Sequence, residues 1–284
     1  MAAYEYARRN RCPLLLYIWD LPPWRLGTGR PDLVFELGGR IRRWPRAINR
    51  YPERAGYYSR LRYVAQRAAE VWCPSANSVR DVAARFHVDP TRMPFCYDSD
   101  RFAGGDPDPG GADAIPTFLC ISRLVPHKNH AVMLRAAARL TPKPAIRIIG
   151  QGAEAPNLRR LAVELGVPLR LTDTWVSDDE ILSAYRSARG VICPSRFEGF
   201  GLTPMEGVAM GRPVVASDIP PHREFVRQQV RFFTPDDDRA LAEAMQGVLG
   251  SSEPIATPAR SPLPDLTIEA CADRFLPGLN QLLA

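Results

Sequence analysis

The sequence predicts an α/β protein of two Rossmann-like domains, the first incomplete and the second a six-stranded parallel sheet. Three observations support this. Short apolar runs alternate with helical stretches after residue 116, these runs are almost continuously hydrophobic, and a segment rich in glycine, proline and aspartate divides the chain. Strands that alternate with helices are typical of a parallel sheet. Uninterrupted hydrophobic strands are typical of a sheet covered by helices on both faces.

The first hundred residues predict a thin parallel sheet of three strands. The strands are expected at "CPLLLYIWD" (12–20), "AAEVWCPS" (68–75) and "RMPFCY" (92–97), and helices are expected at 2–10, 57–67 and 76–87. Residues 21–56 show no clear period. We therefore assign residues 1–105 to a shortened N-terminal domain.

Residues 106–116 are expected to form a linker, because "GGDPDPGGADAIP" (104–116) has the composition of a loop and no periodicity. The second domain follows at 117–262. Its six predicted strands are "TFLCIS", "AIRIIG", "LRLTDTWV", "GVICPS", "RPVVAS" and "VRFFT". Ser177 and Glu180 have the spacing of a capping box at the start of a helix. Residues 263–284 predict a C-terminal helix that packs back toward the first domain.

Positive charge is concentrated in the first domain. Residues 1–105 hold 18 arginines and 10 acidic residues, whereas the rest of the chain has a small acidic excess. Segment 40–67 contains nine of these arginines, one acidic residue and five interleaved aromatic side chains. A solvated basic face would explain this segment, and so would a surface for an anionic acceptor or an anionic membrane. A nucleic-acid partner is not expected, because no nucleic-acid-binding module accompanies the arginines.

Cysteine usage and hydropathy predict the compartment. The six cysteines show no CxxC spacing, no apolar run approaches 18 residues, and the N-terminus has no apolar segment. These features predict a cytoplasmic protein with reduced thiols, either free in solution or peripheral on the inner face of the membrane.

The loop "SRFEGFGLTPMEGVAMG" (195–211) is the first candidate site. Ligands of an open parallel sheet bind at the carboxyl ends of its strands, and this loop follows the strand "GVICPS". Gly199 and Gly201 would let the backbone approach a ligand closely. Thr203 and Pro204 suit the N-cap and the first position of a helix, whose N-terminus would favour a phosphate.

Two glutamates flank this turn. Glu206 either closes a capping box with Thr203 or accepts hydrogen bonds from the hydroxyl groups of a ligand. Glu198 lies in the glycine-rich loop, where an acid either binds a ligand or faces solvent. Carboxylates on both sides of a phosphate-binding turn would suit a nucleotide-sugar, which carries hydroxyl groups on both sides of its phosphates.

Two further loops follow strands. "ISRLVPHKNH" places Arg123 and Lys128 beside a helix start, where their charges would neutralise a diphosphate leaving group without a metal. Two solvated cations are the alternative. "IIGQGAE" holds Gly150 and Gly152, which a tight turn would also require. His222 also follows a strand, where it would either contact the donor or be a solvated loop residue, and the second is expected.

The chain resembles the retaining, nucleotide-sugar-dependent glycosyltransferases of family 4, which have the GT-B fold. The matching segments are "ISRLVPHKN", "IIGQGAE", "VSDDEILSAYRSA", "CPSRFEGFGLTPMEGVAMGRPVVASDIP" and "IEACADRFLPGLNQLL", which cover nearly all of residues 117–284. Glu198 to Glu206 reproduces the Glu-x7-Glu motif of the family. The N-terminal half matches at "AAEVWCPSANSVRDVAARFHVDPTRMPFCYDSDRF" and at "LLLYIWDLPPW", where Trp19 replaces the usual histidine and Asp20 remains.

The resemblance implies a role for each matching residue. Arg123 and Lys128 would bind the donor diphosphate, Glu198 would contact the donor sugar, and Glu206 would hold the ribose hydroxyl groups. The residues implied in catalysis are Glu198, Arg123, Lys128 and Asp20. The base would lie against the segment around Thr174 to Ser177. The donor-binding set comprises Gly150, Gly152, Thr174, Trp175, Val176, Gly199, Phe200, Gly201, Leu202, Thr203 and Glu206.

Together these features predict a glycosyltransferase that moves a sugar from a nucleotide-diphosphate sugar to an unknown acceptor with retention of configuration. No metal is expected, and no cofactor besides the donor substrate. A non-catalytic or partner-dependent nucleotide-sugar-binding subunit is the alternative, and another GT-B enzyme, such as a sugar-nucleotide epimerase, is a third. Because the first domain lacks counterparts to the first strands of the family, we expect a homo-oligomer or a partner chain that completes it.

Overall fold

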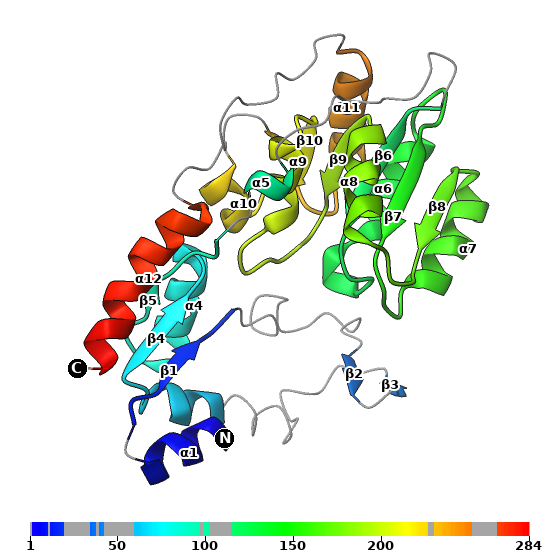
Figure 1. The fold of residues 1–284 in the computed structure, drawn as a ribbon. Helices are drawn as coiled ribbons and strands as arrows, with labels where there is room; N and C mark the ends of the chain where they lie inside the picture. The colour runs from blue at the N-terminus through cyan, green and yellow to red at the C-terminus, as the bar shows by residue number, and fades with distance from the viewer. Residues whose placement is uncertain are drawn as a thin grey trace. The chain divides into compact units, whose positions relative to one another are not determined.

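The computed structural model describes residues 2–10, 12–19, 35–37, 40–42, 60–96, 99–102, 115–226, 230–251 and 266–283. The chain forms two compact units. Unit 1 comprises Met1–Tyr97, Glu198–Phe200 and Asp265–Ala284, and unit 2 comprises Asp98–Phe197 and Gly201–Pro264. Figure 1 labels most of the helices and strands of each unit.

Unit 2 is built on a six-stranded sheet in the order β11-β10-β9-β6-β7-β8, and every neighbouring pair is parallel. The chain fills one half of this sheet and then the other, so the strand order reverses between β6 and β9. The predicted six-stranded parallel sheet is therefore confirmed. The strands are β6 (Thr117–Ile121), β7 (Ala145–Ile149), β8 (Leu169–Thr172), β9 (Gly190–Cys193), β10 (Val214–Ser217) and β11 (Val230–Phe233).

Helices bury the strands of this sheet, which explains their nearly continuous hydrophobicity. Both β9 and β10 are buried at every position. The core contains Phe118, Ile146, Ile148, Ile192 and Met245, each fully or almost fully buried. Burial of one such side chain contributes about 1.5–3 kcal/mol relative to its exposure to water.

The helices of unit 2 start and end at residues that satisfy their free backbone groups. Ser177 accepts from the amide of Glu180, and the Glu180 side chain accepts from the amide of Ser177, so the predicted capping box is confirmed. Asp237 caps the last helix of the unit. The elements are α5 (Ser99–Phe102), η1 (Pro126–Lys128), α6 (His130–Ala138), α7 (Ala155–Leu165), α8 (Asp178–Ser187), α9 (Leu202–Ala209), α10 (Pro220–Phe225) and α11 (Asp238–Leu249).

Unit 1 contains a three-stranded parallel sheet in the order β1-β4-β5, as the sequence predicts. The third strand is shorter than the predicted 92–97, because β5 spans only Thr91–Arg92. Its core includes Ile18, Val71, Val82 and Phe86. A separate antiparallel pair, β2 with β3, falls in the segment for which the sequence shows no period. The elements are α1 (Ala2–Asn10), β1 (Leu15–Tyr17), β2 (Phe35–Leu37), β3 (Arg40–Arg42), β4 (Glu70–Cys73), α4 (Ala76–Phe86), β5 (Thr91–Arg92) and α12 (Ile268–Leu283), and residues 60–65 are also helical.

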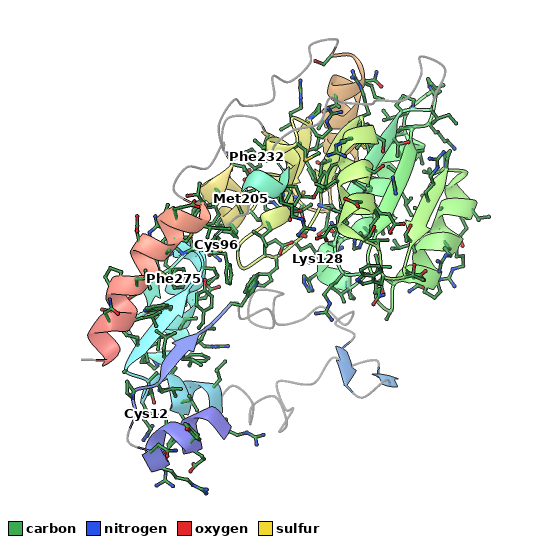
Figure 2. The ribbon with its side chains drawn as sticks, viewed as in Figure 1. Cys12, Cys96, Lys128, Met205, Phe232 and Phe275 are labelled. Carbon is green, nitrogen blue, oxygen red and sulfur yellow. The ribbon has the colours of Figure 1, made fainter. Side chains whose placement is uncertain are left out.

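The C-terminal helix α12 belongs to unit 1 and packs on its sheet. The ring of Phe275, labelled in Figure 2, meets the ring of Trp72 edge-on with 5.2 Å between centroids. Gly278 lies so close to Trp72 that a Cβ at this position would be 2.9 Å from the indole. Cys271 is buried beside Pro94.

Candidate functional site

The candidate residues of unit 2 gather where the strand order reverses. The loop after β6 and the loop after β9 leave neighbouring strands at the same edge of the sheet. Backbone and side-chain hydrogen bonds join them: the amide of Arg196 donates to the carbonyl of His127 at 2.8 Å, and the hydroxyl of Thr203 donates to the carbonyl of Ile121 at 3.1 Å. The carboxyl edge at such a reversal is the usual ligand site of an open parallel sheet.

The loop after β6 carries Arg123 and Lys128. Arg123 is exposed and Lys128 is half-buried at the end of η1, where Figure 2 labels it. Asn129 then takes a left-handed conformation, with φ of 58°, and α6 begins. Both cations therefore lie on one short loop that leads into a helix N-terminus, an arrangement that favours an anion.

His130 lies buried beneath this loop. Its Nε2 is 2.8 Å from the hydroxyl of Ser122. Burial, together with the positive charges of Lys128 and His127, lowers the pKa of His130 from 6.5 to about 4. The Nδ2 of Asn129 and the Nδ1 of His130 are buried without a hydrogen-bond partner among the described residues. The imidazole is thus neutral at physiological pH and leaves the positive charge of the loop to its arginine and lysine.

Gly150 and Gly152 follow β7 and pack against the backbone of the loop after β6. A Cβ on Gly150 would lie 1.9 Å from the carbonyl oxygen of Ser122, and one on Gly152 would lie 2.3 Å from that of Leu124. Their φ angles are 153° and 154°, which side chains rarely adopt. The structure therefore gives both glycines a packing role, and their contact with a donor stays a prediction.

The helix after β9 starts earlier than the sequence suggests. Gly201 is the N-cap of α9, with φ of 100°, and Leu202 is the first helical residue. The prediction that Thr203 is the N-cap and Pro204 the first position is therefore wrong. Only glycine readily adopts the conformation required at the turn, so the helix begins there and not at the hydroxyl residue.

Glu206 does not close a capping box. The hydroxyl of Thr203 donates to the carbonyl of Ile121, and the Glu206 Oε2 accepts from the hydroxyl of Tyr185 at 2.6 Å. Burial raises the pKa of Glu206, while the Tyr185 hydrogen bond and the charge of Arg101 oppose this rise. The capping-box interpretation of Glu206 is thus excluded.

His222 lies beside the turn at Gly201 and is buried. It is 1% exposed, in α10, so the prediction of a solvated loop residue is wrong. Its Nδ1 lies 2.9 Å from the carbonyl oxygen of Ser217, and its ring borders Gly201, where a Cβ would be 3.0 Å from Cδ2. The pair of prolines before it is the signal that could have revealed a helix start.

The segment predicted to face a base connects β8 to α8. Thr174 and Trp175 are exposed, the indole of Trp175 to 81%, and Val176 is half-buried. The segment follows β8, which pairs with β7. At the ends of these two strands the amide of Gly150 donates to the carbonyl of Thr172 at 2.9 Å. The three predicted positions therefore lie at the same carboxyl edge as the glycine loop.

Glu198, Gly199 and Phe200 belong to unit 1 and not to unit 2. The carbonyl of Gly199 accepts from the hydroxyl of Ser78 at 3.2 Å. The ring of Phe200 meets that of Phe95 edge-on, with 5.5 Å between centroids. The Glu-x7-Glu motif is thus divided, with its first glutamate in one unit and its second in the other.

Some candidates lie outside the described residues. These are Asp20 and most of the basic segment 40–67. Within the part of the chain that the structure describes, no cluster of three histidine, cysteine or acidic side chains is arranged to hold a metal ion. A bilayer-spanning helix is not found in that part either.

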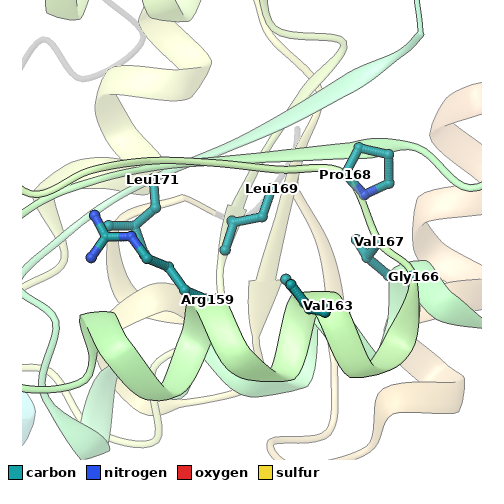
Figure 3. Close-up of a pocket in the computed structure, with 8 residues that line it drawn as sticks. Arg159, Val163, Gly166, Val167, Pro168, Leu169 and Leu171 are labelled. Carbon is teal, nitrogen blue, oxygen red and sulfur yellow. The ribbon is translucent and has the colours of Figure 1, made fainter.

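A groove of about 490 Å³ lies between α7 and β8, away from the candidate residues (Figure 3). Its lining is largely apolar, with Val163 exposed to 83% and Leu169 and Leu171 on the strand side. β8 is the last strand of the sheet order. None of the predicted site residues lines this groove.

Comparison with known sequences identifies a family and several relatives of this chain. The profile of the family described as "Glycosyl transferases group 1" matches residues 110–257, just over half of the chain. The O-antigen chain mannosyltransferase RfbU of Salmonella typhimurium is 29% identical, over 46% of this chain and 38% of the relative. A D-inositol 3-phosphate glycosyltransferase of Geodermatophilus obscurus is 32% identical, over 66% of this chain and 46% of the relative.

A third relative is a GDP-mannose-dependent alpha-(1-6)-phosphatidylinositol monomannoside mannosyltransferase of Mycolicibacterium smegmatis. It is 33% identical over 55% of this chain and 42% of its own length. The chain thus spans less than half the length of these curated relatives.

Solved structures share the fold. HepE of Anabaena in complex with UDP-glucose superposes with a TM-score of 0.77 at 16% identity, covering 98% of this chain and 75% of that one. Sucrose-phosphate synthase of Thermosynechococcus elongatus gives a TM-score of 0.69 at 21% identity, covering 81% and 62%. The predicted GT-B fold is confirmed by this likeness, which at such identities concerns the fold alone.

Proposed function

The chain belongs to the glycosyl transferases group 1 family, and we propose that it transfers a sugar from a nucleotide-diphosphate sugar to an acceptor. One observation carries this proposal. Arg123 and Lys128 lie on one loop that leads into a helix N-terminus, at the point where the strand order reverses. The neighbouring loop leads to Glu206, whose carboxylate does not cap its helix. Cations for a diphosphate and a carboxylate for hydroxyl groups are the groups that such a donor requires.

The proposed roles follow from this chemistry. Arg123 and Lys128 stabilise the charge that develops on the leaving diphosphate, and Glu206 accepts hydrogen bonds from the ribose. Glu198 contacts the donor sugar, Asp20 lies on the acceptor side, and the base lies against 174–176. Relatives support a nucleotide donor: one is named as GDP-mannose-dependent, and HepE was solved with UDP-glucose.

We further propose retention of configuration without a metal. The bond between the sugar C1 and the phosphate oxygen breaks, the acceptor oxygen bonds to C1 on the same face, and the acceptor proton passes to the leaving phosphate. The two cations supply the charge that a metal supplies elsewhere. Transfer should therefore persist in EDTA and give a product with the anomeric configuration of the donor. Loss of transfer in EDTA, restored by a divalent cation, would show the metal-free mechanism to be wrong.

The proposed acceptor is anionic. Residues 1–105 carry eight more arginines than acidic residues, a field that attracts anions. Two relatives are named for phosphorylated inositol acceptors, D-inositol 3-phosphate and a phosphatidylinositol monomannoside. We propose an acceptor of this class, met in the cytoplasm or on the inner face of the membrane.

The test uses the purified chain with UDP-glucose, UDP-N-acetylglucosamine and GDP-mannose, each with inositol 3-phosphate or vesicles that contain phosphatidylinositol. Release of nucleoside diphosphate that depends on the acceptor supports transfer. Donor binding without transfer favours the alternative, a partner-dependent or non-catalytic subunit, and light scattering then shows whether the chain assembles with a second copy. Failure to bind any nucleotide or nucleotide-sugar would overturn the proposal.

A further inference from the structure

Tyr185 is a buried residue to which the sequence assigns no role. It lies on α8, is fully buried, and donates its hydroxyl to Glu206 Oε2 at 2.6 Å. Glu206 Oε1 receives no hydrogen bond from another described residue. One carboxylate oxygen is thus held by the protein, and the other is left to accept.

The surroundings fix this pair in place. The ring of Phe102, on α5, meets the ring of Tyr185 edge-on with 6.0 Å between centroids. Burial raises the pKa of Tyr185 well above 10, and the charge of Glu206 raises it further, as do the thiols of Cys193 and Cys120. These thiols lie on β9 and β6, the two strands between which the order reverses. The phenol therefore remains a donor at every physiological pH, at the strand edge where the candidate loops meet.

We propose that Tyr185 is a positioning residue that orients the Glu206 carboxylate toward the ribose and makes the site select ribonucleotide over 2′-deoxyribonucleotide donors. This inference rests on the proposed function. A carboxylate has about four acceptor positions. With one oxygen held by the phenol, the other is fixed in a direction from which it accepts from the 2′- and 3′-hydroxyl groups together. A deoxyribose supplies only one of these donors, and a site built for a hydroxyl rejects the analogue that lacks it.

The test compares matched pairs of nucleoside diphosphates by calorimetry: UDP with 2′-deoxy-UDP, and GDP with 2′-deoxy-GDP. The pair whose ribonucleotide binds more tightly is used. A hydrogen bond to a charged group corresponds to about a 10- to 100-fold preference for the ribonucleotide in the wild-type protein. In Tyr185→Phe the preference should fall below about threefold, mainly through weaker ribonucleotide binding, while the deoxynucleotide affinity hardly changes.

Tyr17→Phe is the matched control. The Tyr17 hydroxyl also donates a 2.6 Å hydrogen bond, to the carbonyl of Met93 in unit 1, so this variant removes a phenol hydrogen bond outside the candidate residues of unit 2. This variant should keep the full ribonucleotide preference. In Glu206→Gln the preference should also be lost, and adding Tyr185→Phe to it should change nothing more, since the two residues act as one group.

The outcomes separate the inference from the function on which it rests. A wild-type protein that binds neither diphosphate defeats the proposed function, and the inference with it. A wild-type preference that Tyr185→Phe retains defeats the inference alone. Should Tyr185→Phe fail to fold, ¹³Cζ-labelled tyrosine in the wild-type protein replaces it. The Tyr185 resonance should shift more with the ribonucleotide than with the deoxynucleotide, and an equal shift with both would overturn the proposal.

Discussion

Arg196 and Asp236 form an ion pair in which Nη2 lies 2.6 Å from Oδ1. Arg196 follows β9 and Asp236 follows β11, and Arg196 Nη1 also donates to the carbonyl of Pro126 at 2.9 Å. One guanidinium thus connects three loops at the carboxyl edge of the sheet, including the loop that holds Lys128.

Arg196→Ala should therefore weaken nucleoside diphosphate binding several-fold with little loss of stability. A partly exposed ion pair contributes less than about 1 kcal/mol to unfolding, but the loops lose their common anchor. Calorimetry with UDP or GDP measures the affinity. The control is Arg160→Ala, which removes an exposed ion pair to Glu164 on α7. Equal affinities of the two variants would contradict the anchoring role.

Lys128→Ala and Arg123→Ala should each lower nucleoside diphosphate affinity by about 10- to 100-fold, because each removes a charge-assisted contact. Lys143→Ala is the control, since the chain has only these two lysines and Lys143 donates to the carbonyl of Leu165 at the end of α7. If both site variants keep the wild-type affinity, the diphosphate does not bind at this loop.

Gly150→Ala should destabilise unit 2 by at least about 2 kcal/mol, because its Cβ would lie 1.9 Å from a backbone oxygen and its φ is 153°. Gly250→Ala provides the comparison. Gly250 has φ of −79°, and a Cβ there would lie 3.5 Å from the carbonyl oxygen of Gln246. That change should leave stability the same or raise it slightly. Urea unfolding measures the free energy of unfolding of both variants. Similar values would show that a Cβ at Gly150 does not clash with the backbone.

The lowered pKa of His130 predicts that the stability of the protein depends on pH. Its pKa is about 4 in the folded protein and 6.5 in the unfolded chain, so the folded state favours the neutral imidazole. The stabilisation is fully present above pH 6.5 and is lost as pH falls toward 4. Linkage gives a loss of about 2 kcal/mol between pH 7 and pH 5. Urea unfolding at pH 7 and pH 5 measures the free energy of unfolding. Between these two pH values His130→Gln should lose about 2 kcal/mol less of it than the wild-type protein. Equal losses would exclude His130 as the cause.

The order of elements was predictable from sequence because it depends on local patterns. The hydrophobic runs of unit 2 predicted all six strands, and the spacing of Ser177 and Glu180 predicted a cap that the structure contains. These signals lie within one element and need no knowledge of distant residues.

Sequence spacing does not determine which hydrogen-bond partner a side chain takes when several are possible. Thr203 could cap its helix or bond elsewhere, and only the position of Ile121, some eighty residues away, decides for the second. Glu206 likewise accepts a hydrogen bond from Tyr185 on another helix, and His222 packs beside the turn at Gly201. Such contacts follow from tertiary packing, which sequence spacing does not encode.

The edge position of β8 has a consequence for the protein at high concentration. A strand with an open edge can recruit strands from other molecules. In β8 the exposed Arg170 stands directly opposite Arg147 of β7, and burial together with the charge of Arg170 lowers the pKa of Arg147. A strand of another molecule that paired with β8 would have to desolvate the guanidinium of Arg170 beside the like charge of Arg147. We therefore expect the arginine pair to protect against aggregation, and Arg170→Val to turn a clear concentrated solution turbid on storage.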